Sequence, residues 1–487
     1  MNAKAKSINF YLFLIISISF ISTKTFSQNE NLARYLVTAA ENNPEVKASF
    51  YDYLASVEKI PQVGSLPDPE LSLGFFLQPM DRLMGRQQAD IRLMQMFPWF
   101  GMLRTRKDEA GKMAQANYEL FQDAKNNLFF EVKNTWYQMY RLEEEIRITE
   151  ENLKILQTLE QLALVRFQSA GVSSSPGNMP GSSSMGNNSQ GATSASSMGN
   201  MGSGMNTGKS AGPASSGNPS SMGPLGASMG SGKSGMSDVL RIRMEIKELE
   251  NRLARLNDDR IPLQAEFNQL LNRNLSEPVE IADTLTNKAL FTEHMALLDS
   301  ITQNNPMLKM LDAEEAAYEA QMKMARLEGK PMLGAGVNYM PFSPRTEDGM
   351  SMGGKDMVMP MVSLTIPIYR KKYDALYKEA ELKQQAVKFR RENTVNQLAT
   401  QWSQSIRDLE DAGRRTDLYR EQTGLAEQTL NLLMTNYSSD GGGFEEVLRV
   451  QQQLLDYRLK LITAVVDQHT AVALLENLAA SDGLMER

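Results

Sequence analysis

The sequence predicts a mainly α-helical fold with a small β part, built as a tandem internal repeat. Long stretches of the 487-residue chain place apolar residues at the heptad spacing of coiled coils. Two other stretches alternate apolar and polar residues with the period of a β-strand. The same landmarks also occur twice in the same order. We therefore expect two copies of one unit: helix, β-hairpin, long helix, turn and returning helix.

The first β-hairpin is expected over residues 69–99, as two strands of about ten residues each. Large apolar residues fill every second position of its first strand, and small or polar residues lie between them. Such alternation indicates a sheet with one apolar face. The pattern returns over 331–369, where we expect the second hairpin. The apolar positions of the first strand are Leu71, Leu73, Phe75 and Leu77.

The duplication is visible in the spacing of its landmarks. Asn42-Asn43-Pro44 recurs 262 positions later as Asn304-Asn305-Pro306, and Gly74 recurs at the same distance as Gly336. One constant displacement indicates a duplication rather than chance. The first repeat then covers 29–273 and the second 274–487. We expect long helices over 101–170 and 370–437, returning helices over 237–273 and 444–480, and a helix over 288–330 before the second hairpin.

A segment of different composition interrupts the first repeat at residues 172–236. It consists almost entirely of Ser, Gly, Asn, Pro and Met and has no apolar period, a composition typical of disorder. The turn from Phe167 to Leu240 spans 73 positions, against 11 from Tyr437 to Leu448 in the second repeat. About 62 residues have therefore been inserted at the tip of one loop.

The composition excludes several classes of protein. The formal net charge is −7 and no long basic run occurs, so we expect no nucleic-acid partner. The chain has no Cys and two His, which leaves no disulfide, no thiolate metal site and little material for histidine catalysis. No phosphate-binding Gly motif follows a strand. We therefore predict that the protein is not an enzyme and has no resident cofactor.

Residues 1–28 have the layout of a signal peptide. Two Lys precede a short apolar run that ends in small and polar residues, and the run is shorter than the roughly 20 residues of a spanning helix. We expect the mature chain to be exported, without a lipid anchor because no Cys follows the run. Membrane insertion would then be by strands. Four strands leave open edges that hydrocarbon does not tolerate, so a closed barrel needs several chains.

Together these features resemble the TolC-type outer membrane efflux family. The resemblance covers the mature chain except 172–236 and rests on the duplicated plan and on short motifs in a fixed order. These motifs are Leu66-Pro67-Asp68-Pro69 before the first hairpin, Phe97-Pro98-Trp99-Phe100-Gly101 after it, Gly171 with Asp238-Val239-Leu240, Tyr437 with Glu446-Val447-Leu448, and Leu270-Leu271-Asn272-Arg273.

The resemblance implies a homotrimer in the cell outer membrane. Each chain would give four strands to a 12-stranded β-barrel, and the long helical hairpins would form a periplasmic α-barrel. The implied function is a passive exit duct of a tripartite efflux system, with a periplasmic adaptor protein and an inner-membrane transporter, which we expect to be of the RND type. The apolar stripe of the first hairpin would then face outer membrane lipid.

In this family the helical turns dock the adaptor and close the channel. The sequence departs from the family pattern there, because Ala170 and Asp440 stand where the family has Gly, and Gly171 and Gly441 follow one position later. The second turn also lacks the Arg of the Arg–Asp latch that some relatives use. The positions implied are Phe167, Gly171, Asp238, Val239 and Leu240 in the first turn, and Tyr437, Asp440, Gly441, Glu445, Glu446, Val447 and Leu448 in the second.

Acidic residues at these turns admit two interpretations. Threefold symmetry would convert each acid into a ring, and acidic rings select cations in channels. Acids in the first turn of a helix are also favoured by the helix dipole. The sequence leaves both open for Asp238, Asp440, Glu445 and Glu446.

Methionines are concentrated in two places. Thioether sulfur suits Cu(I) and would suit Ag(I), and a flexible chain can bring three sulfurs together; the alternative is compositional drift in a low-complexity segment. Six more, between positions 340 and 361 of the second hairpin, are either ordinary lipid or loop positions or part of a metal path. Both clusters favour the heavy-metal (copper and silver) branch of the family. The inserted methionines are Met179, Met185, Met198, Met201, Met205, Met222, Met229 and Met236, and those of the hairpin are Met340, Met350, Met352, Met357, Met359 and Met361.

The sequence therefore favours an outer membrane duct that exports Cu(I) or Ag(I), with transient metal binding at most. A multidrug or type I secretion duct is the alternative within the family. A secreted coiled-coil scaffold or metal-sequestering protein is the alternative from another class.

Overall fold

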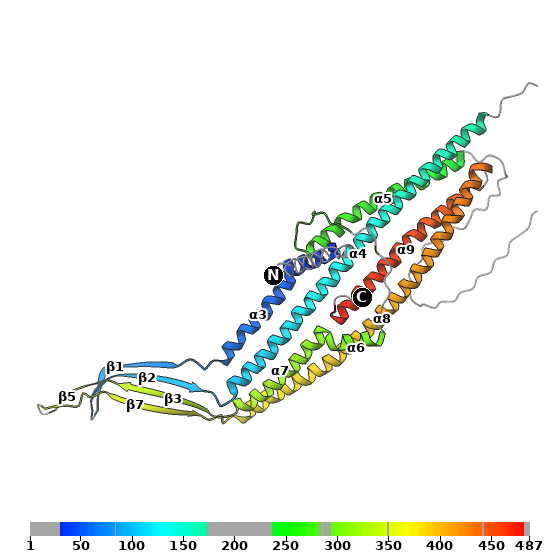
Figure 1. The fold of residues 1–487 in the computed structure, drawn as a ribbon. Helices are drawn as coiled ribbons and strands as arrows, with labels where there is room; N and C mark the ends of the chain where they lie inside the picture. Colours follow the sequence, from blue (N-terminus) through cyan, green and yellow to red (C-terminus); the bar gives the residue numbers. More distant parts are fainter. Residues whose placement is uncertain are drawn as a thin grey trace, which may run out of the picture. The chain divides into compact units, whose positions relative to one another are not determined.

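The computed structural model describes residues 30–82, 84–172, 236–281, 285, 294–347, 350–440 and 443–481. It divides into two compact units, one of residues 1–154 and 247–487 and one of residues 155–246, and each is considered by itself below. The predicted fold class is confirmed: the described residues are mainly helical, with a small sheet (Figure 1). The predicted signal peptide, 1–28, lies outside the described residues.

The helices follow the same order in both repeats. In each, two short helices precede the strands and two long ones follow them. Those of the first repeat are α2 (Glu30–Asn42), α3 (Pro44–Gly64), α4 (Met102–Val172) and α5 (Met236–Leu270), and those of the second are α6 (His294–Asn304), α7 (Pro306–Glu328), α8 (Arg370–Asp440) and α9 (Phe444–Ala479).

The structure differs from the sequence-based expectation at several helix ends; α5, for example, ends at Leu270 and not at 273. The helix expected over 288–330 is broken at Asn305, because the residue before a proline is driven out of the helical region. The break expected from Ser438 is wrong: α8 continues to Asp440, and the Ser438 hydroxyl donates to the backbone oxygen of Thr435 (2.7 Å) within this last turn. Helix α5 begins at Met236, so Asp238 lies inside its first turn.

The two predicted hairpins join in one antiparallel sheet. Its long strands lie in the order β1-β2-β3-β7, and the central pair, β2 with β3, joins the first repeat to the second. Three short strands between β3 and β7 were not expected; β4 pairs with β2, and β5 pairs with β6. The long strands are β1 (Glu70–Arg82), β2 (Gly85–Phe97), β3 (Met332–Met340) and β7 (Met357–Thr365), and the short ones are β4 (Phe342–Ser343), β5 (Arg345–Glu347) and β6 (Met350–Met352).

The repeated Asn-Pro motif performs the same task in both repeats. The Asn43 side-chain oxygen accepts hydrogen bonds from the backbone N–H groups of Glu45 (2.9 Å) and Val46 (3.2 Å), which caps α3. Its amide nitrogen donates to the backbone oxygen of Leu270 at 3.0 Å, near the end of the returning helix. Asn43 is buried, so these bonds join two helices away from water.

In the second repeat Asn305 caps α7 through the backbone N–H of Met307 and donates to the Leu478 oxygen, both at 3.0 Å. Leu478 follows Leu270 by 208 positions, the displacement that also separates Leu240 from Leu448. The duplication has therefore kept an interhelical hydrogen bond as well as the order of elements.

Each returning helix is followed, within two positions of its last residue, by a residue with left-handed backbone. Asn272 has φ 51° and Ala480, again 208 positions later, has φ 48°. Asn adopts this conformation readily, whereas Ala does so at a cost of about 1–2 kcal/mol. Arg273, the next residue in the first repeat, donates to Asn268 at 2.7 Å and covers the Tyr35 ring, which anchors the connection after α5.

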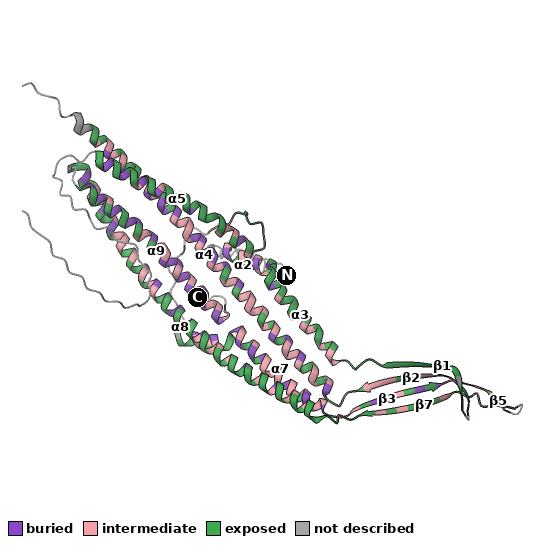
Figure 2. Ribbon diagram, turned by 180° about the vertical axis from the view of Figure 1, so that it is seen from behind, coloured by how far each residue is buried: buried purple, intermediate pink, exposed green. Residues whose placement is uncertain are grey.

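The heptad seams are mostly buried. Val132 and Leu156 of α4 are 0% and 1% exposed, and Val466 and Ala473 of α9 pack into the same cluster as Val132. A second cluster joins α6, α7, α8 and α9 around Leu297, Ile301 and Leu475. Figure 2 shows buried segments alternating with intermediate and exposed ones along the helices. Among the described helices, none has an apolar stretch long enough to cross a bilayer.

The clamp at Asn305 can be tested by Asn305→Ala. We expect the free energy of unfolding to fall by about 1–3 kcal/mol, because α7 loses its cap and the Leu478 oxygen loses its donor. Circular dichroism during chemical denaturation measures the change. Asn304→Ala is the matched control, since its exposed side chain bonds only Ser300 among the described residues. Equal losses in both variants would contradict the clamp.

Candidate functional site

The sheet presents its apolar side chains on the exposed face. Residues directly opposite each other in antiparallel strands point to the same side. Leu73 of β1 lies opposite Ile91, Ile91 opposite Tyr339, and Tyr339 opposite Val358, so one row crosses four strands. Most large residues on this face are exposed, among them Leu71, Leu73, Phe75, Leu93, Val337, Val358, Val362 and Leu364.

The opposite face is the more covered one. In β3, Gly334, Asn338 and Met340 are buried while the residues between them are intermediate or exposed. In β7, Met361 and Ser363 are half-buried while Val362 between them is 84% exposed. A sheet with exposed apolar residues on one face and covered glycines and polar residues on the other is the inverse of a water-soluble sheet, and it fits a lipid environment on the apolar side.

The outer strands of this sheet have free edges. Within the described residues β1 pairs only with β2, and β7 only with β3. Each outer strand therefore has backbone N–H and C=O groups along one side with no strand to pair with. Leu77, in the irregular part of β1 where the pairing shifts between Phe75 and Met80, is fully exposed.

The first helical turn belongs to the smaller unit. Val239 is 0% exposed and Asp238 9%, whereas Phe167 and Leu240 are half exposed. The Ser237 hydroxyl lies 3.5 Å from an Asp238 carboxylate oxygen, and Arg243 pairs with Glu160 at 2.6 Å across α4 and α5. Gly171 lies in the last turn of α4, which ends at Val172. Residues 173–235 lie outside the described chain.

The second turn belongs to the larger unit. Tyr437 and Phe444 are both buried and their rings lie 5.7 Å apart, closing the end of the α8–α9 pair. Gly443 has φ 85°, a left-handed conformation that suits Gly, and its oxygen accepts from Glu446 and Val447, beginning α9. Val447 is 0% exposed and Leu448 is half-buried.

The acids of this turn lie where the helix dipole favours them. Glu445 and Glu446 are exposed in the first turn of α9, and Glu446 pairs with Arg449 at 3.0 Å. Gly441 lies outside the described residues, and the Asp440 side chain is likewise not described.

One of the eight inserted methionines lies in the part of the chain that the structure describes. Met179, Met185, Met198, Met201, Met205, Met222 and Met229 lie outside the described residues. Met236 is the first residue of α5 and is 47% exposed. No group of three or more His, Asp or Glu side chains in the described ranges is arranged to hold a metal.

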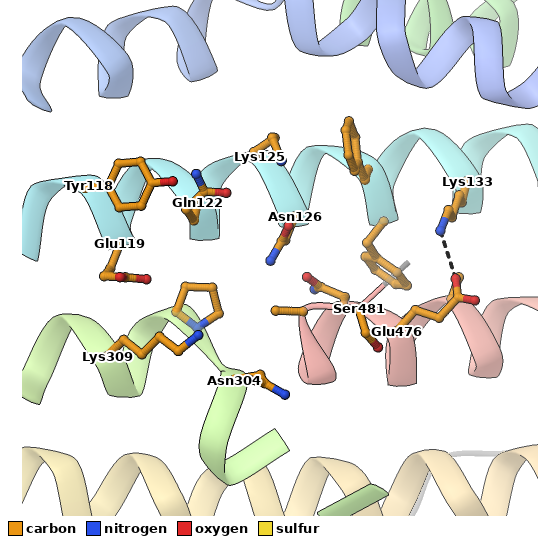
Figure 3. Close-up of a pocket in the computed structure, with 16 residues that line it drawn as sticks. Tyr118, Glu119, Gln122, Lys125, Asn126, Lys133, Asn304, Lys309, Glu476 and Ser481 are labelled. Carbon is orange, nitrogen blue, oxygen red and sulfur yellow. Dashed lines mark hydrogen bonds and ion pairs between the residues drawn. The ribbon is translucent and has the colours of Figure 1, made fainter. Parts of the chain in front are cut away.

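A polar cleft lies where α4 of the first repeat meets α7 and α9 of the second. Its volume is about 330 Å³. Glu119 and Lys309 face each other across it, and Lys133 donates to Glu476 at 2.8 Å (Figure 3). Both partners of this pair are largely withdrawn from water, with side chains 14% and 13% exposed. Burial raises the pKa of Glu119, and the nearby Lys309 opposes that shift.

Beside the cleft, His469 is buried, and its ring centre lies 5.3 Å from that of Tyr137. Burial, and after it the charge of Glu476, raise the pKa of Tyr137. His469 thus packs between helices α4 and α9. These contacts join the two repeats and provide no catalytic arrangement in the described chain.

Comparison with known proteins agrees with this architecture. Residues 297–481 match the model of the family Outer membrane efflux protein. No curated protein matches the sequence. The second repeat therefore carries the sequence pattern of an efflux protein family.

Solved structures show the fold over nearly the whole chain. The outer membrane protein VceC from Vibrio cholerae is 13% identical with a TM-score of 0.65, and the alignment covers 92% of this chain and 96% of VceC. The Neisseria gonorrhoeae MtrE outer membrane channel is 13% identical (TM-score 0.65, coverage 93% and 90%). CusC is 12% identical (TM-score 0.66, coverage 95% and 96%). The chain thus has the fold of the TolC-type outer membrane channels.

The two faces of β1 can be tested with charges. We expect Leu73→Asp to reduce the amount of assembled protein in the membrane, because it places a carboxylate on the apolar face, where charge is costly. Ser72→Asp should be tolerated, because Ser72 lies on the other face directly opposite Arg92. The measurement is the fraction of each variant recovered from detergent extracts as assembled oligomer. Equal recovery would contradict the assignment of the faces.

The buried pair of the cleft gives a second prediction. Lys133→Met should lower the free energy of unfolding by about 3–5 kcal/mol, because the Glu476 carboxylate is left buried without its partner. The double variant Lys133→Met with Glu476→Leu should regain most of that loss, since no charge remains uncompensated. Denaturation followed by circular dichroism measures both. A double variant as unstable as the single one would contradict this account.

Proposed function

We propose that this chain is one subunit of a passive efflux duct in the cell outer membrane. The observation that carries the proposal is the inverted sheet: large apolar side chains are exposed on one face, the residues of β3 on the other face are more covered, and both of its outer edges are free in the described chain. The family match over 297–481 and the fold shared with VceC and MtrE support the same location.

Three copies would complete the channel. Pairing β7 of one copy with β1 of the next would satisfy the free edges and close a 12-stranded barrel, as transmembrane sheets require. The long helices α4, α5, α8 and α9 would continue this channel through the periplasm as an α-barrel. Charged and polar side chains along these helices are compatible with a wet lumen and a wet exterior.

The proposal assigns the helical turns to adaptor docking and channel closure. Tyr437, Phe444 and Val447 hold the second turn together, while Glu445 and Glu446 remain exposed for contacts. The partners would be a periplasmic adaptor protein and an inner-membrane transporter of the RND type. The relatives are named as channels and efflux proteins, so the proposal contains no catalytic step.

We further propose that the cargo is a soft monovalent metal ion, Cu(I) or Ag(I). The methionine content supports this: 31 residues in all, eight of them in the inserted segment and its border. Thioethers prefer such ions. A multidrug or type I secretion duct remains the competing assignment.

Closure between copies is testable because the chain has no Cys of its own. Leu73→Cys in β1, combined in turn with Val358→Cys, Val362→Cys or Leu364→Cys in β7, should give oxidative crosslinks between copies for at least one pair. The products on a denaturing gel should not exceed three chains. Leu73→Cys with Val337→Cys is the control, since β3 has partners on both sides. Recovery as a water-soluble monomer would favour the secreted scaffold instead.

Deleting residues 174–236 tests the cargo. If the duct exports metal with help from the inserted methionines, the deletion should reduce copper and silver tolerance of producing cells while the trimer persists. Unchanged metal tolerance together with lost drug tolerance would favour the multidrug assignment.

A further inference from the structure

On the covered face of the sheet, methionine side chains of β2 and β7 lie beside two glycines of β3. Three strands contribute one residue each to successive rows on this face. The first row is Met96, Gly334 and Ser363, and the next is Met94, Gly336 and Met361. Glu70 of β1 extends the second row, opposite Met94 on the side away from β3. In both rows the middle residue, on β3, is a glycine.

The two sulfurs of β2 converge on one point. The Ser363 hydroxyl lies 3.7 Å from the Met94 sulfur and 3.8 Å from the Met96 sulfur, although β3 separates β2 from β7. Both side chains therefore reach across the backbone of β3. This is possible because β3 has no side chains in these two rows.

The glycines are needed for this arrangement. A Cβ on Gly334 would lie 2.7 Å from the Met96 sulfur and 3.3 Å from that of Met94, and one on Gly336 would lie 3.0 Å from the Met94 sulfur. Glycine weakens a strand and often marks a place where a ligand or another group approaches the backbone closely. Here it leaves room for thioethers.

Further donors border the patch. Met361 lies on the same face as Met94, across Gly336, and is half-buried. In the next row Asn338 is 1% exposed, and its side-chain oxygen accepts no hydrogen bond in the described chain. The donors beside the two glycines are thus sulfur and neutral oxygen, a set that prefers soft ions of low charge over Mg²⁺ or Ca²⁺. The charged residues of these rows, Glu70 opposite Met94 and Arg92 opposite Asn338, are both exposed.

We propose that Met94, Met96 and Met361 form a thioether site for Cu(I) or Ag(I) on the face of the sheet opposite the apolar stripe. This site deepens the proposed function. Its location in the lumen rests on that proposal, because in the duct this face of the sheet lines the lumen. The two glycines and Ser363 keep the site open. Weak, replaceable sulfur ligands suit a transit site, because an ion must leave a channel as readily as it enters.

Protection of methionine from oxidation tests the site residue by residue in the full chain. Purified protein in detergent is exposed to hydrogen peroxide with silver nitrate or with potassium nitrate, and sulfoxide formation is followed by peptide mass spectrometry. Silver at about ten times its dissociation constant should slow oxidation of Met94, Met96 and Met361 by about tenfold. The exposed Met244 and Met295 are internal controls and should oxidise equally in both salts.

A variant identifies the ligand set. Met94→Leu conserves volume and removes one sulfur, so Met96 and Met361 should lose their protection. Met244→Leu is the matched control and should leave their protection unchanged. Continued protection in Met94→Leu would overturn the ligand set, and no protection in the wild-type chain would overturn the site, leaving the sulfurs as packing over glycine.

Size-exclusion chromatography of the same sample separates this inference from the duct. A trimer without protection overturns the metal site and leaves the duct standing. Protection in a monomer supports the site and overturns its place in a lumen, together with the duct.

Discussion

Backbone hydrogen bonding at the edges of the sheet is the constraint on which the rest of this molecule depends. The four long strands pair their backbone N–H and C=O groups with one another, but the outer sides of β1 and β7 have no partner strand in the described chain. A hydrocarbon environment does not tolerate such edges. In the proposed duct, hydrocarbon accounts for both features: it covers the exposed apolar face, and it requires a neighbour on both sides of every strand, which the association of three copies would supply.

Duplication supplies the parts for this sheet and fixes how they meet. The hairpin of one repeat pairs with that of the other through β2 and β3, so a single repeat could not make the methionine patch, which needs β2, β3 and β7. Below the sheet, Asn43 and Asn305 each cap one helix and hold the end of another. The Lys133–Glu476 pair then joins α4 of one repeat to α9 of the other.

Where expectation and structure differ, local chemistry explains the difference. Pro306 drives Asn305 out of the helical region, so α6 ends at Asn304 and one expected helix becomes two. Helix α8 extends past Ser438 to Asp440, and the hydroxyls of Ser438 and Ser439 bond to the Thr435 oxygen of the preceding turn. The strands β4, β5 and β6 have two or three residues each, too few to show a period, so pattern analysis could not detect them.

The sequence by itself determined the class of fold, the duplication, the position of the inserted segment and the alternation of Leu71, Leu73 and Phe75, because these are periodicities of 3.5, 2 and one repeat length. Only the tertiary structure decided that Met94 and Met96 reach over Gly334 to Ser363, since register between strands far apart in sequence sets which side chains become neighbours. The tertiary structure likewise decided that the buried charges of Lys133 and Glu476 form an ion pair, because only helix packing brings these two residues together.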